Sequence, residues 1–150
     1  MAPSLQMSRS EREAFLSGRH VGVISIEDPG RGPISAPIWY DYAPDSGLWV
    51  ITMRDSRKGK ALERAKRFSL VAQQEEMPYR YVSVEGPIVE RRPADTEKDG
   101  RPMAHRYLGV EFGNAYIDSQ NVDSQEGDGD FVYRMRPERW LTVDYAKLSS

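Results

Sequence analysis

Residues 34–60 read ISAPIWYDYAPDSGLWVITMRDSRKGK, and this stretch contains two predicted strands, a turn and the start of a helix. The β-branched and aromatic residues of 34–42 and 48–53 favour strands, and a Pro-Asp-Ser-Gly turn separates them. Upstream, residues 20–27 read HVGVISIE and predict one more strand. Three short strands joined by tight turns indicate an antiparallel meander rather than strands that alternate with helices.

Pro37 lies inside the predicted strand 34–42 and has no backbone N–H to donate to a ladder. We therefore expect this strand to lie at a sheet edge, or to carry a bulge or a ligand-facing irregularity at that residue.

The rest of the chain also contains more strands than helices. Helices are predicted at 8–19, 56–68 and 93–108, and strands at 68–73, 79–91, 130–136 and 139–145. Gly100 and Pro102 split the third helix or delay its start to about Arg101, and the acidic residues 117–130 are expected to form a mobile loop. We expect one domain over 1–150, with 1–7 as a disordered tail. Its fold is predicted to be mainly β, a closed or partly closed barrel of six to seven antiparallel strands in a Greek-key-like order, with peripheral helices.

Composition and charge exclude several classes of protein. The chain has 150 residues, 21 of them Lys or Arg and 23 Asp or Glu, and its net charge of -2 argues against generic binding to nucleic acid. It has no cysteine, which excludes disulfides and thiol chemistry, and only two histidines, His20 and His105. No apolar run of about 20 residues and no apolar segment near residue 1 occurs, so we expect a cytoplasmic protein without a membrane span.

Positive charge is concentrated in residues 54–67, which contain seven basic and two acidic residues. Ser56 stands where a strand ends and a helix begins, so it can cap the helix beside unpaired backbone N–H groups. With Arg57 and Lys58 alongside, this junction can hold a phosphate. A solvated helix face with a capping serine explains the same residues, and both interpretations stay open.

Aromatic residues are frequent in the predicted strands. They can stack on a planar ligand, and they can equally pack a core or a dimer interface. In the segment 79–86, Tyr79, Tyr81, Ser83 and Glu85 share one face, which is polar enough to line a pocket or to meet a partner. Serine-hydrolase elbows and Gly-rich nucleotide loops are absent from the sequence, and its acidic stretch lacks EF-hand spacing.

Six short motifs, taken in order along the chain, resemble a known family. They are SAPIWY at 35–40, LWVIT at 48–52, SRK at 56–58, YRYVSVEGP at 79–87, RYLG at 106–109 and MRPERW at 135–140. Together they resemble the pyridoxamine 5′-phosphate oxidase-like split β-barrels that bind FMN. More narrowly, they resemble the F-420-dependent flavin/deazaflavin oxidoreductases of the B group of actinobacteria. The resemblance runs from about Arg9 to Tyr145.

The resemblance implies a homodimer with two cofactor sites at the subunit interface. It assigns Thr52, Ser56, Arg57 and Lys58 to the cofactor phosphate, and adds Lys60 for an anionic oligoglutamylated tail. Beside the ring it places Pro37, Ile38 and Trp39, with Arg139 and Trp140 from the other subunit. It places Met77 and Tyr79 on the substrate side.

The implied reaction is hydride transfer from reduced coenzyme F-420 to an unsaturated or conjugated small molecule. The cofactor performs the difficult step, so no acid/base triad is needed. Tyr79, Tyr81 or solvent can supply the proton. Two alternatives stay open: an FMN-dependent oxidoreductase, and a non-catalytic binder of F-420, FMN or haem. No metal site is expected.

Overall fold

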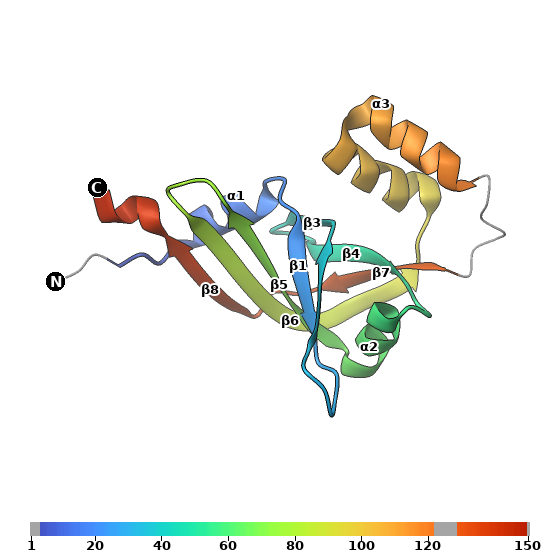
Figure 1. Cartoon of the computed structure of the whole chain (residues 1–150), viewed down its shortest axis with the longest axis horizontal. Coiled ribbons are helices and arrows are strands. Elements are labelled where there is room, and N and C mark those ends of the chain that lie inside the picture. The colour runs from blue at the N-terminus through green and yellow to red at the C-terminus, as the bar shows by residue number, and fades with distance from the viewer. Residues whose placement is uncertain (1–3, 122–128, 150) are drawn as a thin grey trace.

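The computed structural model describes residues 4–121 and 129–149, and in this part eight strands form one sheet (Figure 1). In spatial order the sheet runs β2-β1-β5-β6-β7-β4-β3, and β8 pairs with β6 outside this path. All of these pairs are antiparallel. The strands are β1 (Gly22–Ile26), β2 (Ile34–Ile38), β3 (Tyr40–Ala43), β4 (Gly47–Met53), β5 (Arg67–Gln74), β6 (Arg80–Pro93), β7 (Asp130–Met135) and β8 (Arg139–Asp144).

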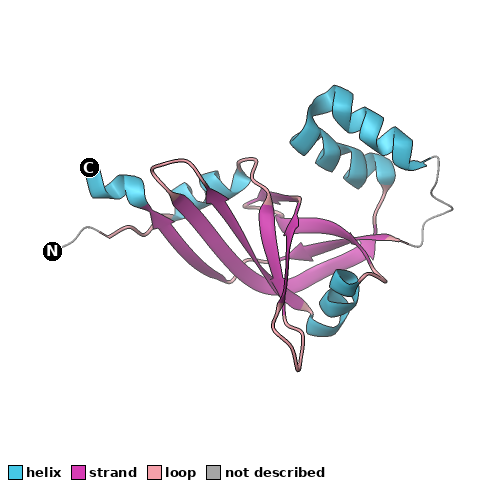
Figure 2. Cartoon of the chain, viewed as in Figure 1, coloured by secondary structure: helices cyan, strands magenta, loops and turns pink. Residues whose placement is uncertain are grey.

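The long strand β6 belongs to both halves of the curled sheet. Its first part pairs with β5 and β8, and its last part pairs with β7, with a shift of register between Ile88 and Glu90. Just before this shift, a Cβ on Gly86 would collide with the Arg136 carbonyl oxygen, so the two segments approach only because residue 86 is glycine. The sheet therefore curls into a split β-barrel with helices at its periphery, which confirms the predicted fold class (Figure 2).

The predicted strand 34–42 is interrupted at Trp39. β2 pairs with β1 at one end of the sheet order, and β3 pairs with β4 at the other end. The antiparallel pairing of the predicted strand 34–42 with the strands before and after it is confirmed. The single strand is wrong, because the chain crosses at Trp39 from one end of the sheet order to the other and forms two strands there. The described residues consequently form eight strands rather than six to seven. Pro37 lies in the terminal strand β2, as its missing N–H predicted.

Three α-helices of the described residues lie around the sheet: α1 (Arg9–Ser17), α2 (Arg57–Ala65) and α3 (Arg101–Asn121). A π-helical turn over Thr96–Gly100 precedes α3, which confirms the expected start near Arg101. The helix does not end at 108, however. It reverses at Gly109, whose φ is 81°, and a second arm continues to Asn121 (Figure 1). No helix of the described residues is long and apolar enough to cross a membrane.

The loop prediction for 117–130 is wrong at both ends, since Ile117 is buried in α3 and Asp130 begins β7. Residues 122–128 lie outside the described part of the chain. The two arms of α3 pack closely at Gly113, where a Cβ would lie 2.8 Å from the Cδ2 atom of His105. Gly109 at the reversal and Gly113 at the close approach therefore permit a helical hairpin.

The core lies inside the curled sheet and is closed by α1 and α2. Leu70, Val82 and Val84 from the strands and Leu16 from α1 are at most 1% exposed. The segment 4–7, part of the expected disordered tail, lies against β8: Met7 is buried and its N–H donates to the Thr142 hydroxyl at 3.0 Å. Residues 1–3 lie outside the described part.

Candidate cofactor site

Helix α2 begins at the junction for which the sequence predicts a phosphate site. The Ser56 hydroxyl accepts from the Gly59 N–H at 3.0 Å and donates to the Met53 carbonyl oxygen at 2.6 Å. The backbone N–H groups of Arg57 and Lys58 find no acceptor among residues 4–121 and 129–149. Ser56 is therefore a helix cap whose proton is already used, and the free donors of the junction are two backbone N–H groups.

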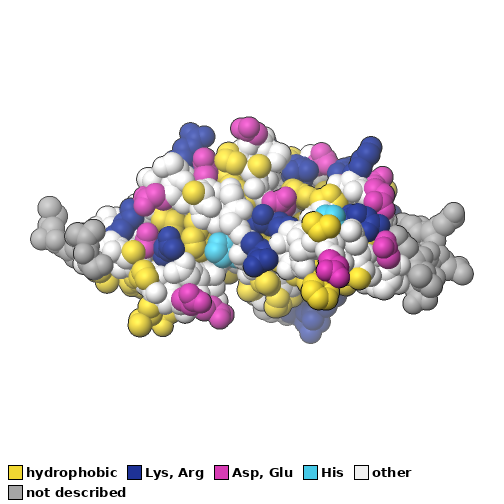
Figure 3. Space-filling view, turned by 90° about the horizontal axis from the view of Figure 1, so that it is seen from above, with side chains coloured by type: hydrophobic (Ala, Val, Ile, Leu, Met, Phe, Trp, Pro, Cys, Tyr) yellow, Lys and Arg dark blue, Asp and Glu magenta, His cyan; other side chains and the backbone are white. Residues whose placement is uncertain are grey.

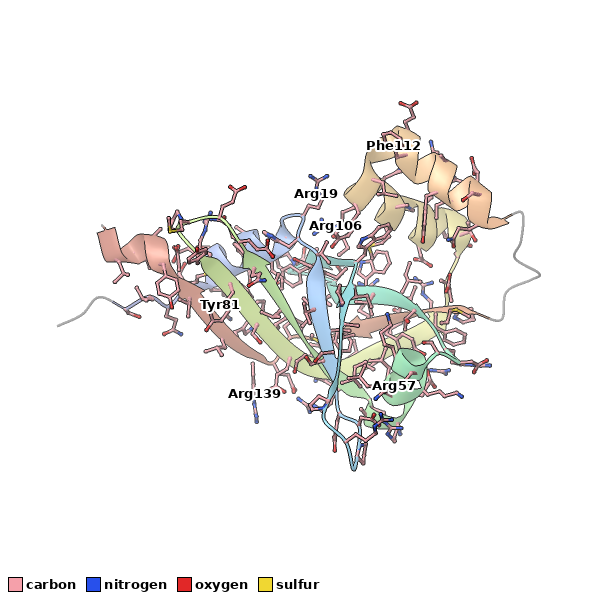
Figure 4. The ribbon with its side chains drawn as sticks, in the orientation of Figure 1. Arg19, Arg57, Tyr81, Arg106, Phe112 and Arg139 are labelled. Carbon is pink, nitrogen blue, oxygen red and sulfur yellow. The ribbon has the colours of Figure 1, made fainter. Side chains whose placement is uncertain are left out.

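The side chains proposed for the phosphate lie on two sides of this junction. Thr52 is buried near the end of β4, and Lys58 is half-buried in the first turn of α2. Arg57 and Lys60 are exposed and lie on another face of the helix. Arg57 extends toward the loop between β1 and β2, where its guanidinium pairs with Asp28 at 3.1 Å (Figure 4).

A cavity of about 360 Å³ lies between this loop and α2. Its charged lining consists of four cationic side chains and one carboxylate, namely Arg31, Arg57, Lys60, Arg64 and Asp28, and Ile34 completes it. Asp28 pairs with Arg64 as well, at 3.1 Å. The hydrogen bond from Arg57, with Arg64 and Arg31 nearby, keeps the pKa of Asp28 below its ordinary value, so this carboxylate is charged at neutral pH. The cavity thus carries a net positive charge.

Arg57 and Lys60 are predicted site residues that line this cavity, whereas Asp28, Arg31 and Arg64 line it without having been predicted. The helical signal was available, because spacings of three and four residues place Arg57, Lys60 and Arg64 on one face. Asp28 and Arg31 gave no local signal, since they belong to a turn nearly thirty residues earlier in the chain. Arg54, also inside the basic segment, does not line the cavity, and its guanidinium lies 5.2 Å from the Phe131 ring centroid.

The predicted ring site centres on Trp39, at the crossing from β2 to β3. Its ring stacks on Tyr107 of α3, with centroids 5.0 Å apart and planes 4° apart, and Tyr116 lies tilted at 5.7 Å. The Tyr107 hydroxyl accepts from the Tyr40 N–H at 3.0 Å and lies 2.6 Å from the His20 carbonyl oxygen, to which it donates. At this crossing the Tyr107 hydroxyl therefore makes the backbone hydrogen bonds that a neighbouring strand would make elsewhere in the sheet.

Arg106 fixes the same crossing from the other side. It donates to the carbonyl oxygens of Tyr40 at 2.9 Å, Gly18 at 2.7 Å and Ser17 at 3.2 Å, and pairs with Asp41 at 3.3 Å. Three carbonyl acceptors from two separate segments hold one guanidinium, so Arg106 and Tyr107 attach the α3 hairpin to the barrel. The sequence marked both residues as part of a motif but gave neither of them a role.

Arg139 and Trp140, proposed to reach the ring of the other subunit, point to opposite faces of β8. Trp140 packs inward against Tyr42, with ring centroids 6.1 Å apart, and the Arg12 guanidinium lies 4.4 Å over its ring. Arg139 is exposed on the outer face opposite Glu85 (Figure 4). Only Arg139 is therefore free of contacts that tie it to the interior of its own chain.

Met77 and Tyr79 belong to the turn between β5 and β6, and Tyr81 lies at the start of β6, at the end of the sheet remote from α2 (Figure 4 labels Tyr81). Strand β5 separates the two regions, and its eight residues span about 23 Å. Met77 is 78% exposed and Tyr79 is 50% exposed. Within one chain the structure therefore does not bring these residues to the junction.

Both histidines are engaged within the chain. His20 stacks on Phe15, and its Nε2 atom lies 3.0 Å from the Phe15 carbonyl oxygen. Burial lowers the pKa of His20. The Nε2 atom of His105 lies 2.7 Å from the Asn114 side-chain oxygen. In the described residues no group of three or more His, Asp or Glu side chains is arranged to hold a metal ion.

The face that carries α1 and α3 has no comparable concentration of one charge. Seen from above in Figure 3, basic and acidic side chains alternate there with apolar ones. The cation-lined cavity beside α2 is therefore a local feature of the barrel rather than a property of its whole surface.

The eight-stranded curled sheet and its peripheral helices define the class of protein, a split β-barrel. The sequence model of the pyridoxamine 5′-phosphate oxidase family matches residues 8–144, and the chain belongs to that family. No curated protein matches the sequence.

Three solved structures illustrate the range of proteins with this fold. A conserved hypothetical protein, Rv2991 from Mycobacterium tuberculosis, has 22% identity and a TM-score of 0.75, with 97% of this chain and 90% of that one covered. An F-420 reductase has 13% identity, a TM-score of 0.59 and coverage of 86% and 94%. HutZ, the heme storage protein of Vibrio cholerae, has 15% identity, a TM-score of 0.61 and coverage of 93% and 96%. At these identities the likeness is one of fold.

Proposed function

We propose that the protein is a reductase that uses coenzyme F-420 and transfers a hydride from the reduced cofactor to an unsaturated or conjugated small molecule. The observation that carries the proposal is the cavity beside α2, where Arg31, Arg57, Lys60 and Arg64 face the single carboxylate of Asp28. FMN has one phosphate as its only anionic group, whereas F-420 adds an oligoglutamylated tail. A cavity with a net charge of three positive units suits the longer polyanion better.

The start of α2 supplies the phosphate contacts in this proposal. The free N–H groups of Arg57 and Lys58 lie at the positive end of the helix dipole, and the Lys58 ammonium adds a full charge. Ser56 acts indirectly, because its hydroxyl caps the helix and thereby fixes both N–H groups. Thr52 lies just before this turn and lines its buried side.

The crossing at Pro37, Ile38 and Trp39 supplies the ring contacts. The barrel holds this segment rigidly, since Tyr107 and Arg106 bind the backbone of the next residue, Tyr40. When bound, the reduced deazaflavin supplies the hydride, and the chain orients the ring and excludes water. Tyr79 and Tyr81 lie just before and at the start of β6, three strands away from β2 in the sheet order, so in this proposal they donate a proton to the site of a second subunit.

We propose that the sites are completed in a homodimer. The strand register aligns Pro37, Val23, Val71, Ser83 and Leu141 in one row across five strands, on the outer face of the sheet. No helix lies across β5 and β6 on the side turned to the viewer in Figure 1. Leu141 is 62% exposed there, and Arg139 lies one row away. A second copy would cover this apolar row and bring Arg139 toward its partner.

A side-by-side titration with F-420 and FMN, followed by ligand fluorescence at fixed salt, tests the cofactor. We expect tight binding of F-420 and weak binding of FMN. Lys58→Ala should weaken F-420 binding by about one to two decades, the loss expected for one charge-assisted phosphate contact. Lys66→Ala is the matched control, because Lys66 follows the last turn of the same helix, and it should leave the affinity unchanged.

Equal losses of F-420 affinity in Lys58→Ala and Lys66→Ala would show that binding depends only on the overall positive charge of the helix. Preference for FMN would favour the FMN-dependent alternative. A monomeric mass by sedimentation under the same conditions would contradict the shared site. Haem storage is disfavoured as an alternative, because Phe15 and Asn114 already engage the two histidines that could bind iron.

A further inference from the structure

Asp28 is placed as an anion inside a cavity that attracts anions. Its two carboxylate oxygens are divided between Arg57 and Arg64, each at 3.1 Å. Only 15% of the Asp28 side chain is exposed, against 59% and 49% for the two arginines. Arg64 also donates to the Glu27 carbonyl oxygen at 3.3 Å, so three hydrogen bonds from two arginines of α2 tie the loop between β1 and β2 to the helix.

The charges around the cavity change their balance when an anion enters it. Without a ligand, four cationic side chains repel one another, and the Asp28 carboxylate is the only protein charge of the lining that offsets them. An anionic ligand provides the same compensation. The Asp28 carboxylate then becomes a like charge beside the ligand and competes with it for Arg57 and Arg64.

We infer that Asp28 is an internal counter-anion of this cavity that sets its affinity for anionic ligands. When the ligand leaves, Arg57 and Arg64 return to Asp28, so release does not leave them without a charge partner. In the proposed function this keeps the cofactor exchangeable between turnovers. The inference rests on that function only for the identity of the ligand, because the competition applies to any multivalent anion.

The experiment is calorimetric titration of the full chain with inorganic pyrophosphate at low, fixed ionic strength. Removing one negative charge about 6 Å from the anion should tighten binding about three- to tenfold in Asp28→Asn. Glu27→Gln is the matched control. It removes the same charge one residue earlier, but Glu27 is exposed and does not line the cavity. The affinity of Glu27→Gln for pyrophosphate should stay within about twofold of wild type, since exposed charges are well screened.

Three results would overturn the inference. Weaker binding to Asp28→Asn with an unchanged unfolding midpoint would make Asp28 a positioning residue for the arginines. An equal gain in Glu27→Gln would show that only the total charge counts. Absence of pyrophosphate binding to every variant would show that the cavity is no anion site. If Asp28→Asn does not fold, Asp28→Ser provides a second neutral side chain.

This test is separate from the test of the proposed function. Pyrophosphate contains no deazaflavin ring, so failure of F-420 to bind leaves the comparison of Asp28→Asn with Glu27→Gln intact. Conversely, F-420 binding that does not respond to Asp28→Asn would leave the cofactor proposal standing and contradict the role of Asp28.

Discussion

Arg57 and Arg106 use the same guanidinium group in opposite ways. Arg57 is 59% exposed and meets a carboxylate on a loop, whereas Arg106 is 17% exposed and donates to three backbone carbonyl oxygens as well as pairing with Asp41. Exposed ion pairs contribute at most about 1 kcal/mol, while buried charge-assisted hydrogen bonds contribute more. The contacts of Arg57 can therefore exchange for those of a ligand, and the contacts of Arg106 hold the frame.

The phosphate end and the ring end of the proposed site depend on different kinds of interaction. The phosphate end depends on charge, acts over a distance and is weakened by salt. The ring end depends on the position of Trp39. The Tyr107 ring stacks on the Trp39 ring, and the Tyr107 hydroxyl accepts from the N–H of the next residue, Tyr40. Substitutions at the two ends should consequently separate into losses of affinity and losses of stability.

The largest expected effect is that of Arg106→Ala. Removing this side chain takes the charged donor from the carbonyl oxygens of Tyr40, Gly18 and Ser17, while the Tyr40 oxygen keeps its bond from the Tyr107 hydroxyl at 2.9 Å. We expect a loss of about 3 kcal/mol in the free energy of unfolding. Urea denaturation followed by circular dichroism measures it. Arg19→Ala is the control, since Arg19 is exposed and near the same segment, and its loss should stay below about 0.5 kcal/mol. Similar losses in Arg106→Ala and Arg19→Ala would show that the backbone contacts of Arg106 do not hold the frame.

A smaller effect is expected for Tyr107→Phe, which keeps the stacked ring and removes the hydroxyl. The buried Tyr40 N–H then loses its acceptor, at a cost of about 1 to 2 kcal/mol. Tyr116→Phe is the control: this ring also touches Trp39, but no hydrogen bond of its hydroxyl occurs within the described residues. A Tyr107→Phe protein as stable as the wild type would show that the stacked ring and Arg106 fix the crossing without the Tyr107 hydroxyl.

The smallest effect is the pH dependence of the contacts of Asp28. The pKa of Asp28 is lowered in the folded chain from an ordinary value of 3.8, chiefly by the hydrogen bond from Arg57. Its ion pairs therefore stabilise the fold above pH 3.8 and are lost as the pH falls through the lowered value. Thermal unfolding of the wild type and Asp28→Asn should differ slightly at pH 7, with the difference vanishing at acid pH. A constant difference would assign it to packing instead.

Local signals in the sequence predicted the elements well. Ser56 was recognisable as a helix cap, because its partner Gly59 is three residues away. Gly18 and Ser8 likewise bound the first helix, and the capping box between Ser8 and Glu11 is present. Each of these contacts joins residues that are close in the sequence, so composition and spacing were enough.

Contacts across the fold could not be predicted in the same way. The interruption at Trp39 depends on the Tyr107 hydroxyl, which reaches Tyr40 across 67 residues of chain. The pairing of Asp28 with Arg57 spans 29 residues, so neither residue signalled the other. The helix predicted to end at 108 continues to Asn121, because Gly109 reverses the chain with a positive φ within a hairpin. The resemblance named the site segments but gave no account of these connections.

The α3 hairpin is an insertion between two strands that are already paired. Pro93 at the end of β6 lies opposite Phe131 in β7, and the Ala94 N–H donates to the Asp130 carbonyl oxygen at 2.8 Å. Chain entry and exit are thus adjacent, so the barrel fixes where the insertion starts and stops but does not constrain its length. The hairpin therefore starts and ends at neighbouring points of the barrel, as a replaceable segment does. We expect another segment between 94 and 130 to be tolerated if it restores an acceptor for the Tyr40 N–H and a donor for the Tyr40 carbonyl oxygen.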